Sequence, residues 1–357
     1  MAGRVPFAER GGAARGILDL ATGCYPAFLF GGSIGDQLPV FHFHEVTREW
    51  LEPRLLYLSA NDYRTVTADE IARLVIQGVN PGPRSVALTF DDAWESAWSV
   101  ALPLLKQYGF RAILFAIPGR IAEEGQPSPF VTWPQLRELH ESGAFDVQSH
   151  TRSHAMMFTG AEVVNFVTPE FVREPLLNRP ITAMNGHIDT IGADALGTPL
   201  FQRRSRMSDG RRFFPDDKQA ALCREHVARN GGADYFNQPG WERELRAIAA
   251  RSGCERFETD DERSAAIHRE LAESRALLND RLRTTAVKHV ALPWGISGTI
   301  TRAALQATGH ELAFAERPWR RRSVRAGDDR FQLMRLSSRF LTCLPGRGRR
   351  WFFTTVR

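Results

Sequence analysis

The residues whose types and spacing could do chemistry lie in two motifs, Thr89-Phe90-Asp91-Asp92 and His150-Thr151-Arg152-Ser153-His154. Asp92, His150 and His154 supply two imidazoles and a carboxylate, a mixed ligand set that holds a catalytic metal and leaves coordination positions open. The four-residue spacing of the histidines lets a helix start or a tight turn present both rings to one ion. Asp91 then remains as a base for a metal-bound water, so the motifs predict metal-assisted hydrolysis.

Buried strands are predicted directly before these motifs, at 85–90 and 145–149, and a third at 289–292 leads into Pro293-Trp294-Gly295. In a βα barrel, the residues just beyond the strand C-termini face one common mouth, so we expect the three segments to meet there. Each motif alone has a plainer interpretation. An aspartate pair can cap the following helix, here predicted at 93–108, and an HxxxH spacing can arise by coincidence.

Short apolar runs alternate with helical patterns over much of the chain, which is typical of an α/β fold with a largely parallel sheet. Further strands are predicted at 39–43, 112–117, 312–315 and 332–336. Helices are predicted at 133–142, 263–283 and 299–308, and another opens at Thr67, whose spacing to Glu70 is that of a capping box. About seven strands with intervening helices favour an incomplete barrel.

The alternation breaks between residues 155 and 262, where helical patterns are confined to 217–229 and 241–250. So long a stretch between two core elements is unlike a plain loop, and we interpret it as an inserted subdomain or cap. From the N-terminus, we predict an extension at 1–38, a barrel of 39–154 and 263–340 interrupted by the insertion at 155–262, and a tail at 341–357.

The composition is basic, with a formal charge of +5, and lysine occurs only at 106, 218 and 288. Arginines cluster at 203–206, 211–212, 320–322 and 347–350. These clusters are typical of a solvated arginine-rich surface, although they would also suit an anionic or carrier-linked saccharide. They lack interleaved stacking aromatics and a recognisable binding motif, so we expect no nucleic-acid partner.

No run approaches the roughly 20 apolar residues of a membrane span. The mildly apolar segment 16–31 is interrupted by Asp19 and has no convincing cleavage site after it, so we predict no signal peptide there. The four cysteines, Cys24, Cys223, Cys254 and Cys343, are far apart and form no CxxC pair. They are therefore expected to be reduced thiols. Together these features predict a chain without a transmembrane segment and a cytoplasmic location.

Two rival motifs fit their surroundings poorly. Residues 31–35 match the G-x-S-x-G pattern of a serine hydrolase, but a strand rather than a helix follows them. His187-Ile188-Asp189 matches the HxD of iron oxygenases, yet no run of short alternating strands surrounds it.

The ordered motifs resemble those of the NodB-homology polysaccharide deacetylases, carbohydrate esterase family 4, in which TFDD, H-[ST]-x-x-H and a Pro-Tyr-Gly variant follow one another. Residues 39–46 and 312–336 are similar to the branch that deacetylates poly-N-acetylglucosamine. The resemblance covers roughly 36–155 and 263–340 and leaves the long insertion unexplained.

This resemblance implies a distorted (β/α)7 barrel that hydrolyses the N-acetyl group of an amino sugar in a glycan or glycoconjugate. Asp92, His150 and His154 would bind a divalent metal, with zinc the expected ion, and Asp91 would be the catalytic base. Pro293 and Trp294 would lie beside the acetyl group of the N-acetylated saccharide substrate.

Three departures from the family pattern stand out. Ala93 replaces the glycine of TFDDG, and the arginine that orients the catalytic aspartate is absent before Pro293. Arg335, which we also assign to the substrate side, is the candidate replacement. The late Leu-x-His that supplies the general acid has no clear match, which leaves His44, His187 and His289 as candidates. A barrel without an acid would instead be a catalytically impaired carbohydrate-binding protein.

Overall fold

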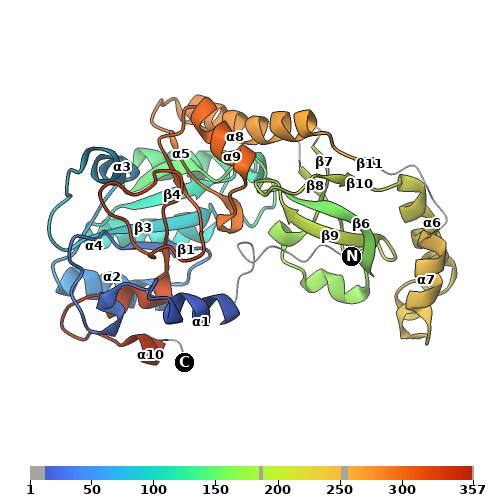
Figure 1. Ribbon diagram of the computed structural model, residues 1–357, viewed down its shortest axis with the longest axis horizontal. Coiled ribbons are helices and arrows are strands. Elements are labelled where there is room, and N and C mark those ends of the chain that lie inside the picture. The colour runs from blue at the N-terminus through green and yellow to red at the C-terminus, as the bar shows by residue number, and fades with distance from the viewer. Residues whose placement is uncertain (1–12, 185–187, 251–255, 356–357) are drawn as a thin grey trace. The chain divides into compact units, whose positions relative to one another are not determined.

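The computed structural model describes residues 13–184, 188–250 and 256–355, and the chain divides into two compact units (Figure 1). Within these ranges, the barrel unit comprises the chain up to Ser153, residues 268–297 and the part from 301 onward. The second unit comprises His154 to Ile267, together with 298–300.

A parallel sheet forms the core of the barrel unit. The spatial order of its strands is β13 (Leu312–Phe314), β12 (His289–Ala291), β5 (Phe145–Ser149), β4 (Ala112–Ala116), β3 (Ser85–Asp92), β1 (Val40–Phe43) and β14 (Leu336–Ser337), and the short β2 (Arg64–Thr65) pairs with β3. Leu333, just before β14, bridges Phe314 of β13, while Leu336 pairs with Phe41 of β1. The segment around β14 therefore links the two edges, and the predicted distorted seven-stranded barrel is confirmed.

Apart from α1, which precedes β1, the helices follow strands along the chain (Figure 1). They are α1 (Ala13–Ala21), α2 (Arg48–Ala60), α3 (Ala68–Gln77), α4 (Leu102–Tyr108), α5 (Trp133–Glu141), α8 (Asp260–Leu282), α9 (Thr299–Ala307) and α10 (Phe352–Thr355). The capping box predicted at Thr67 and Glu70 is present at the start of α3. Helix α2 was not predicted, because Pro53 within it disguises the pattern that buries Leu51, Leu55 and Leu58.

Three element boundaries differ from the sequence-based prediction. Strand β3 continues through both aspartates instead of ending at Phe90. The predicted helix at 93–108 begins late, with a π-helical turn at Ala97–Ala101 before α4, because Asp92 and Ala93 have φ values of 70° and 59°. No right-handed helix accommodates positive φ. The strand predicted at 332–336 is shifted to Leu336–Ser337.

Strand β3 is buried along its whole length, which fixes the position of the aspartates at its end. Its apolar run 85–90 is typical of a parallel strand covered on both faces. Phe90 stacks on Phe43 of β1 with ring centroids 4.9 Å apart, and its other contact, with Phe145 of β5, is edge-on at 5.6 Å. Each fully buried phenylalanine contributes about 2–3 kcal/mol to the free energy of folding.

The second unit is built on antiparallel ribbons, which the sequence did not predict. The paired strands are β6 (Met156–Phe166) with β9 (Pro199–Ser205), β7 (Ile181–Met184) with β8 (Ile188–Thr190), and β10 (Phe213–Phe214) with β11 (Arg256–Phe257). Helices α6 (Asp217–Arg229) and α7 (Trp241–Ala249) agree with the predicted helical patterns. A buried ion pair, Arg206 with Glu258 at 2.8 Å, lies in this unit.

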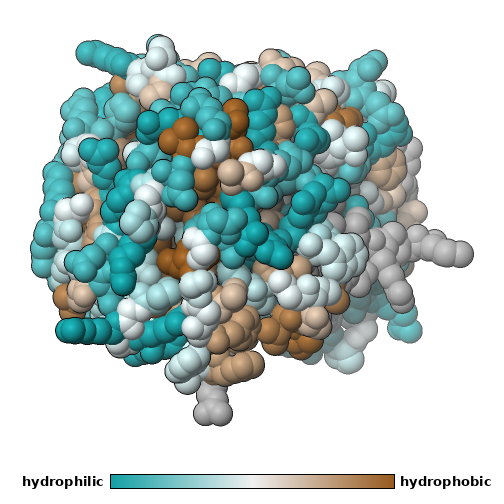
Figure 2. All heavy atoms as spheres, turned by 60° about the vertical axis from the view of Figure 1, so that its left-hand side comes forward, coloured by the Kyte–Doolittle hydropathy of each residue, from teal (hydrophilic) through white to brown (hydrophobic). Residues whose placement is uncertain are grey.

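The arginine clusters are partly neutralised by ion pairs. Arg203 pairs with Glu174, Arg211 with Asp260, and Arg322 with Asp19, at 2.7, 2.8 and 2.7 Å. Figure 2 shows one face of the molecule, on which hydrophilic residues predominate and hydrophobic residues form small separate groups.

Cys24, Cys223 and Cys343 are buried free thiols, as predicted, and Cys254 lies outside the described residues. Over the described ranges, no helix has the length and apolar character that crossing a bilayer requires.

Candidate metal centre

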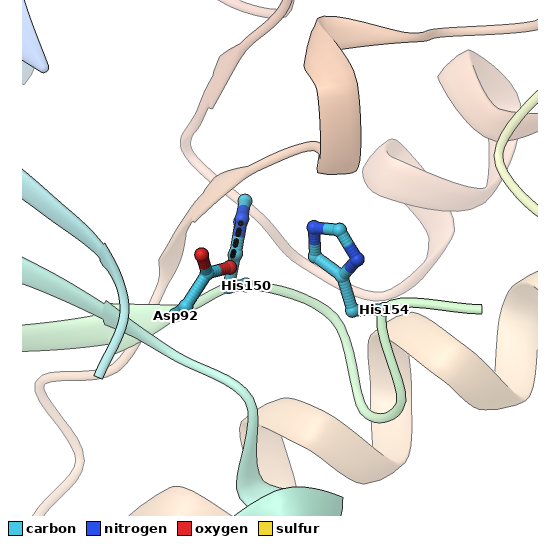
Figure 3. A group of neighbouring side chains, drawn as sticks. All are labelled: Asp92, His150 and His154. Atoms are coloured by element: carbon cyan, nitrogen blue, oxygen red, sulfur yellow. Dashed lines mark ion pairs between the residues drawn. The ribbon is translucent and has the colours of Figure 1, made fainter. Parts of the chain in front are cut away.

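Asp92, His150 and His154 lie close together. Each offers one potential ligand atom, and these three atoms are all within 4.8 Å of one another. Asp92 ends β3, whereas both histidines belong to the loop that leaves β5, as Figure 3 shows. Their exposed fractions are 3%, 2% and 4%, so the three polar groups are removed from bulk water. The structure therefore brings the three predicted ligands to one point.

His150 is held in one orientation by the end of β12. Its Nδ1 lies 2.7 Å from the carbonyl oxygen of Ala291, which can only accept, so Nδ1 carries the hydrogen. Nε2 consequently faces the carboxylate of Asp92, whose Oδ1 is 3.3 Å away. Fixing one ring nitrogen with a carbonyl is the usual way in which a protein presents the other to a metal.

The electrostatic environment favours a cation at this point. Burial disfavours the charged form of His150, but the hydrogen bond that its imidazolium donates to Asp92 and the charges of Asp91 and Asp92 outweigh it and raise its pKa. The two carboxylates thus stabilise positive charge at this point, even when that charge is carried by a protonated imidazole.

The loop that carries both histidines is held by buried polar groups. Glu270 of α8 accepts hydrogen bonds from the backbone nitrogen and the hydroxyl of Ser153, at 3.0 and 2.5 Å. Arg120 donates to the Ser153 carbonyl at 3.1 Å. The loop needs this support because Thr151 and His154 have φ values of 63° and 52°, a strained region for residues with a side chain.

Sequence reasoning did not identify Glu270, although it is only 3% exposed. In the sequence it is one of several acidic residues of a polar helix, and no pattern distinguishes it from those that face water.

The donor set fits a divalent cation. Two imidazoles and a carboxylate match the borderline character of zinc and related transition metals, and three protein ligands leave further positions for reactants. A second group, Asp69, His289 and Glu311, is equally compact. There, however, the Lys288 ammonium lies 3.2 Å from Asp69 and 3.3 Å from Glu311, so a resident cation already neutralises the carboxylates.

Asp91 is paired with Arg335. The guanidinium contacts both carboxylate oxygens at 2.7 Å and also donates to the Thr89 hydroxyl at 2.9 Å. Burial opposes ionisation of Asp91, but the charges of Arg335 and His150 outweigh it and hold its pKa well below the usual range. The residue predicted to replace the missing family arginine thus contacts the predicted base.

Pro293 and Trp294 form a short 3₁₀ turn with Gly295 at the end of β12, close in sequence to Ala291. Pro293 is buried, and Trp294 is partly exposed with a φ of 54°. Gly295 is required at this turn, because a Cβ there would lie 2.6 Å from the Glu316 side chain and its φ is 67°.

Of the three candidate acids, only His44 is shown near the aspartate pair. Its Nε2 is 3.9 Å from Asp91 Oδ2, and its side chain is 55% exposed. His289 begins β12 instead of following it, is fully buried, and bonds to Asp69 at 2.9 Å. His187 lies outside the described residues, as does the HxD motif that begins with it.

Residues 78–185 match the family model described as polysaccharide deacetylase, and this segment contains both motifs. The chain is 28% identical over 126 residues to YxkH of Bacillus subtilis, covering 33% of this chain and 43% of that protein. It is also 28% identical over 109 residues to the poly-beta-1,6-N-acetyl-D-glucosamine N-deacetylase of Staphylococcus aureus, with coverage of 30% and 37%. The chain therefore spans less than half the length of these relatives.

A solved structure shares the fold. The BpsB deacetylase domain from Bordetella bronchiseptica superposes with a TM-score of 0.54 over 86% of this chain and 97% of that one, at 17% sequence identity. At this identity the likeness concerns the fold alone.

Proposed function

Because residues 78–185 match the polysaccharide deacetylase family model, we propose that this chain hydrolyses the N-acetyl group of an amino sugar in a glycan, using a divalent metal. The observation that carries the proposal is the buried cluster of Asp92, His150 and His154 beside an ionised Asp91. The substrate named for the Staphylococcus aureus relative makes N-acetylglucosamine oligomers the first compounds to test.

Asp92, His150 and His154 would hold the cation, for which the donor set favours zinc. When bound, such an ion supplies Lewis acidity that polarises the amide carbonyl and makes water more acidic. Asp91 accepts the proton of the attacking water. Arg335 keeps that carboxylate ionised and fixes both of its oxygens, so the base needs no reorientation before the proton moves.

His44 is the residue that we assign as general acid. It follows β1 and reaches toward Asp91 from the side that is open to solvent, where an amino-sugar nitrogen could receive a proton. Its half-exposed imidazole keeps access to solvent protons. A general acid at this position would argue against a binding protein without turnover.

The central test measures acetate release from N-acetylglucosamine oligomers by purified protein supplied with zinc or cobalt. Asp91→Asn is expected to lower kcat at least 1000-fold while the protein still binds metal, because the step loses its base. The double variant Asp92→Ala with His150→Ala is expected to lose the metal. Glycan binding without acetate release, over several metals and acyl groups, would instead support the catalytically impaired protein.

The acid is tested separately with His44→Gln. We expect kcat to fall about 100-fold and the basic limb of its pH profile to disappear, with metal affinity unchanged. His268→Gln is the matched control, since His268 is an exposed histidine of α8. Activity of His44→Gln equal to that of His268→Gln would remove His44 from the mechanism.

A further inference from the structure

The indole of Trp94 donates a hydrogen bond to a predicted metal ligand. Trp94 Nε1 lies 3.0 Å from Asp92 Oδ2, whereas the other carboxylate oxygen, Oδ1, faces His150 Nε2 at 3.3 Å. We infer that Trp94 is a positioning residue of the metal centre: it occupies Oδ2, so that Asp92 presents Oδ1 beside His150 and His154. This inference rests on the proposed function for the identity of the centre.

The backbone after β3 explains why a residue only two positions away can reach this carboxylate. Asp92 and Ala93 are consecutive left-handed residues, with φ values of 70° and 59°. Two such residues reverse the chain direction at the strand end and bring the side chain of residue 94 back to the carboxylate. Each costs about 1 kcal/mol in backbone energy, so the surrounding structure must hold the turn in place.

Residues 129–131 hold it. The Val131 nitrogen donates to the Ala93 carbonyl at 2.9 Å, and the Glu95 nitrogen donates to the Pro129 carbonyl at 3.0 Å. Between these two bonds, Trp94 forms an antiparallel bridge with Phe130, and their rings lie 4.8 Å apart. Because backbone and ring are both fixed, the indole N–H is directed at Asp92 before any ligand binds.

This hydrogen bond has two consequences for a bound cation. A carboxylate with both oxygens available can occupy two coordination positions, whereas one that shares an oxygen with a donor occupies one. Trp94 therefore preserves a position for reactants as well as orienting the ligand. Losing a partner that orients a ligand typically weakens metal binding by 10- to 100-fold.

The chain offers a matched control four residues away. Trp98 Nε1 donates to Glu138 Oε2 at 2.6 Å, a tryptophan–carboxylate bond with a residue that is not part of the cluster. Trp94→Phe and Trp98→Phe each remove one indole N–H and keep an aromatic ring. Zinc affinity, measured by competition with a chromophoric chelator, is expected to fall 10- to 100-fold in Trp94→Phe and to change less than twofold in Trp98→Phe.

Cobalt provides a readout that a general loss of stability would not change. The visible absorption of bound Co²⁺ weakens as its coordination number rises, so saturated Trp94→Phe should absorb less per ion than wild type or Trp98→Phe. Trp94→His is the rescue variant, because histidine Nε2 occupies the ring position of tryptophan Nε1. We expect Trp94→His to recover at least a third of the lost zinc affinity on a logarithmic scale. This variant also tests the role of the Trp94 hydrogen bond if Trp94→Phe folds poorly.

The outcomes separate the inference from the proposed function. If wild type binds one zinc and Trp94→Phe matches it in both affinity and cobalt spectrum, the role of Trp94 is overturned and the metal centre stands. If wild type binds no zinc or cobalt, or binds them equally well after Asp92→Ala with His150→Ala, the proposed centre fails and the inference fails with it.

Discussion

Arg335 contacts both carboxylate oxygens of Asp91 at 2.7 Å, although 244 residues separate the two in the chain. The contact follows from the position of β14, which pairs with β1, the neighbour of β3 in the sheet. A parallel bidentate pair is the strongest geometry that an arginine and a carboxylate can adopt. The barrel therefore orients its predicted base with the residue that directly precedes its last strand.

Replacing Arg335 should separate charge from orientation. Arg335→Lys keeps a positive charge but cannot contact both oxygens in a plane, and we expect kcat for acetate release to fall at least 10-fold. Arg335→Gln leaves a buried, uncompensated Asp91, and we expect a loss of at least 100-fold. Zinc affinity should stay within threefold in both variants, because the hydrogen bonds of Arg335 run to Asp91 and Thr89. A parallel loss of zinc affinity and kcat would show that Arg335 supports the fold of the site instead.

The support of the histidine loop by Glu270 predicts a second effect. In Glu270→Ala, the buried Ser153 nitrogen and hydroxyl lose the carboxylate that accepts from both. We expect the free energy of unfolding to fall by about 2–3 kcal/mol and zinc affinity to fall more than 10-fold. Urea unfolding of the metal-free protein and chelator competition measure the two quantities.

Glu273→Ala is the control for that experiment. Glu273 lies on the same helix and pairs with Arg152 at 2.8 Å, but its side chain is 46% exposed. An exposed pair contributes little, so stability should change by less than about 1 kcal/mol. Equal effects of the two substitutions would mean that the loop is not held by Glu270.

The sequence predicted the parts of the structure that depend on local patterns. Continuous apolar runs such as 85–90 and 145–149 identified the buried strands, and the motifs directly after them identified three residues that the fold brings together. Strand ends of a parallel barrel share one face, so residue order alone was enough to predict that these motifs meet.

Contacts made across the barrel could not be predicted in the same way. Glu270 and Trp94 resemble ordinary helix and loop residues in the sequence, and their roles depend on burial and on the turn after β3. The ribbons of the second unit were missed because short strands such as β10, two residues long, carry no periodicity. Arg335 was named as the partner of the predicted base only because a family arginine was absent, and the strand order explains how it reaches Asp91.

His310 predicts a weakening of the fold in mild acid. The Thr308 hydroxyl donates to Ala304, so His310 Nδ1 must donate to Thr308, and its Nε2 is buried without a hydrogen-bond partner in the described part of the chain. Burial, with the charges of Arg275 and His289, lowers the pKa of His310 from 6.5 to about 3. Between pH 6.5 and pH 3, His310 therefore binds a proton in the unfolded chain but not in the folded chain. The free energy of unfolding consequently falls as the pH decreases from 6.5 toward 3.

His310→Asn tests this, because the asparagine amide can still donate to Thr308 but does not titrate. Between pH 6 and pH 4, the free energy of unfolding of wild type should decline more steeply than that of the variant, by up to about 1.4 kcal/mol per pH unit. Guanidinium unfolding at fixed ionic strength gives both slopes. Parallel slopes would show that His310 accepts a proton in the folded state.

The C-terminus of α8 predicts a substitution that stabilises the fold. Helix α8 ends at Leu282, and Arg283 then adopts a φ of 52°, so that the nitrogen of Thr284 reaches the Asn279 carbonyl at 2.9 Å. This left-handed cap is the position that glycine occupies without strain. Arg283→Gly should raise the free energy of unfolding by about 1 kcal/mol relative to Arg283→Ala, which loses the same charge but keeps the Cβ. Urea unfolding of the two variants measures the difference, and equal stabilities would mean that the arginine at this cap is not strained.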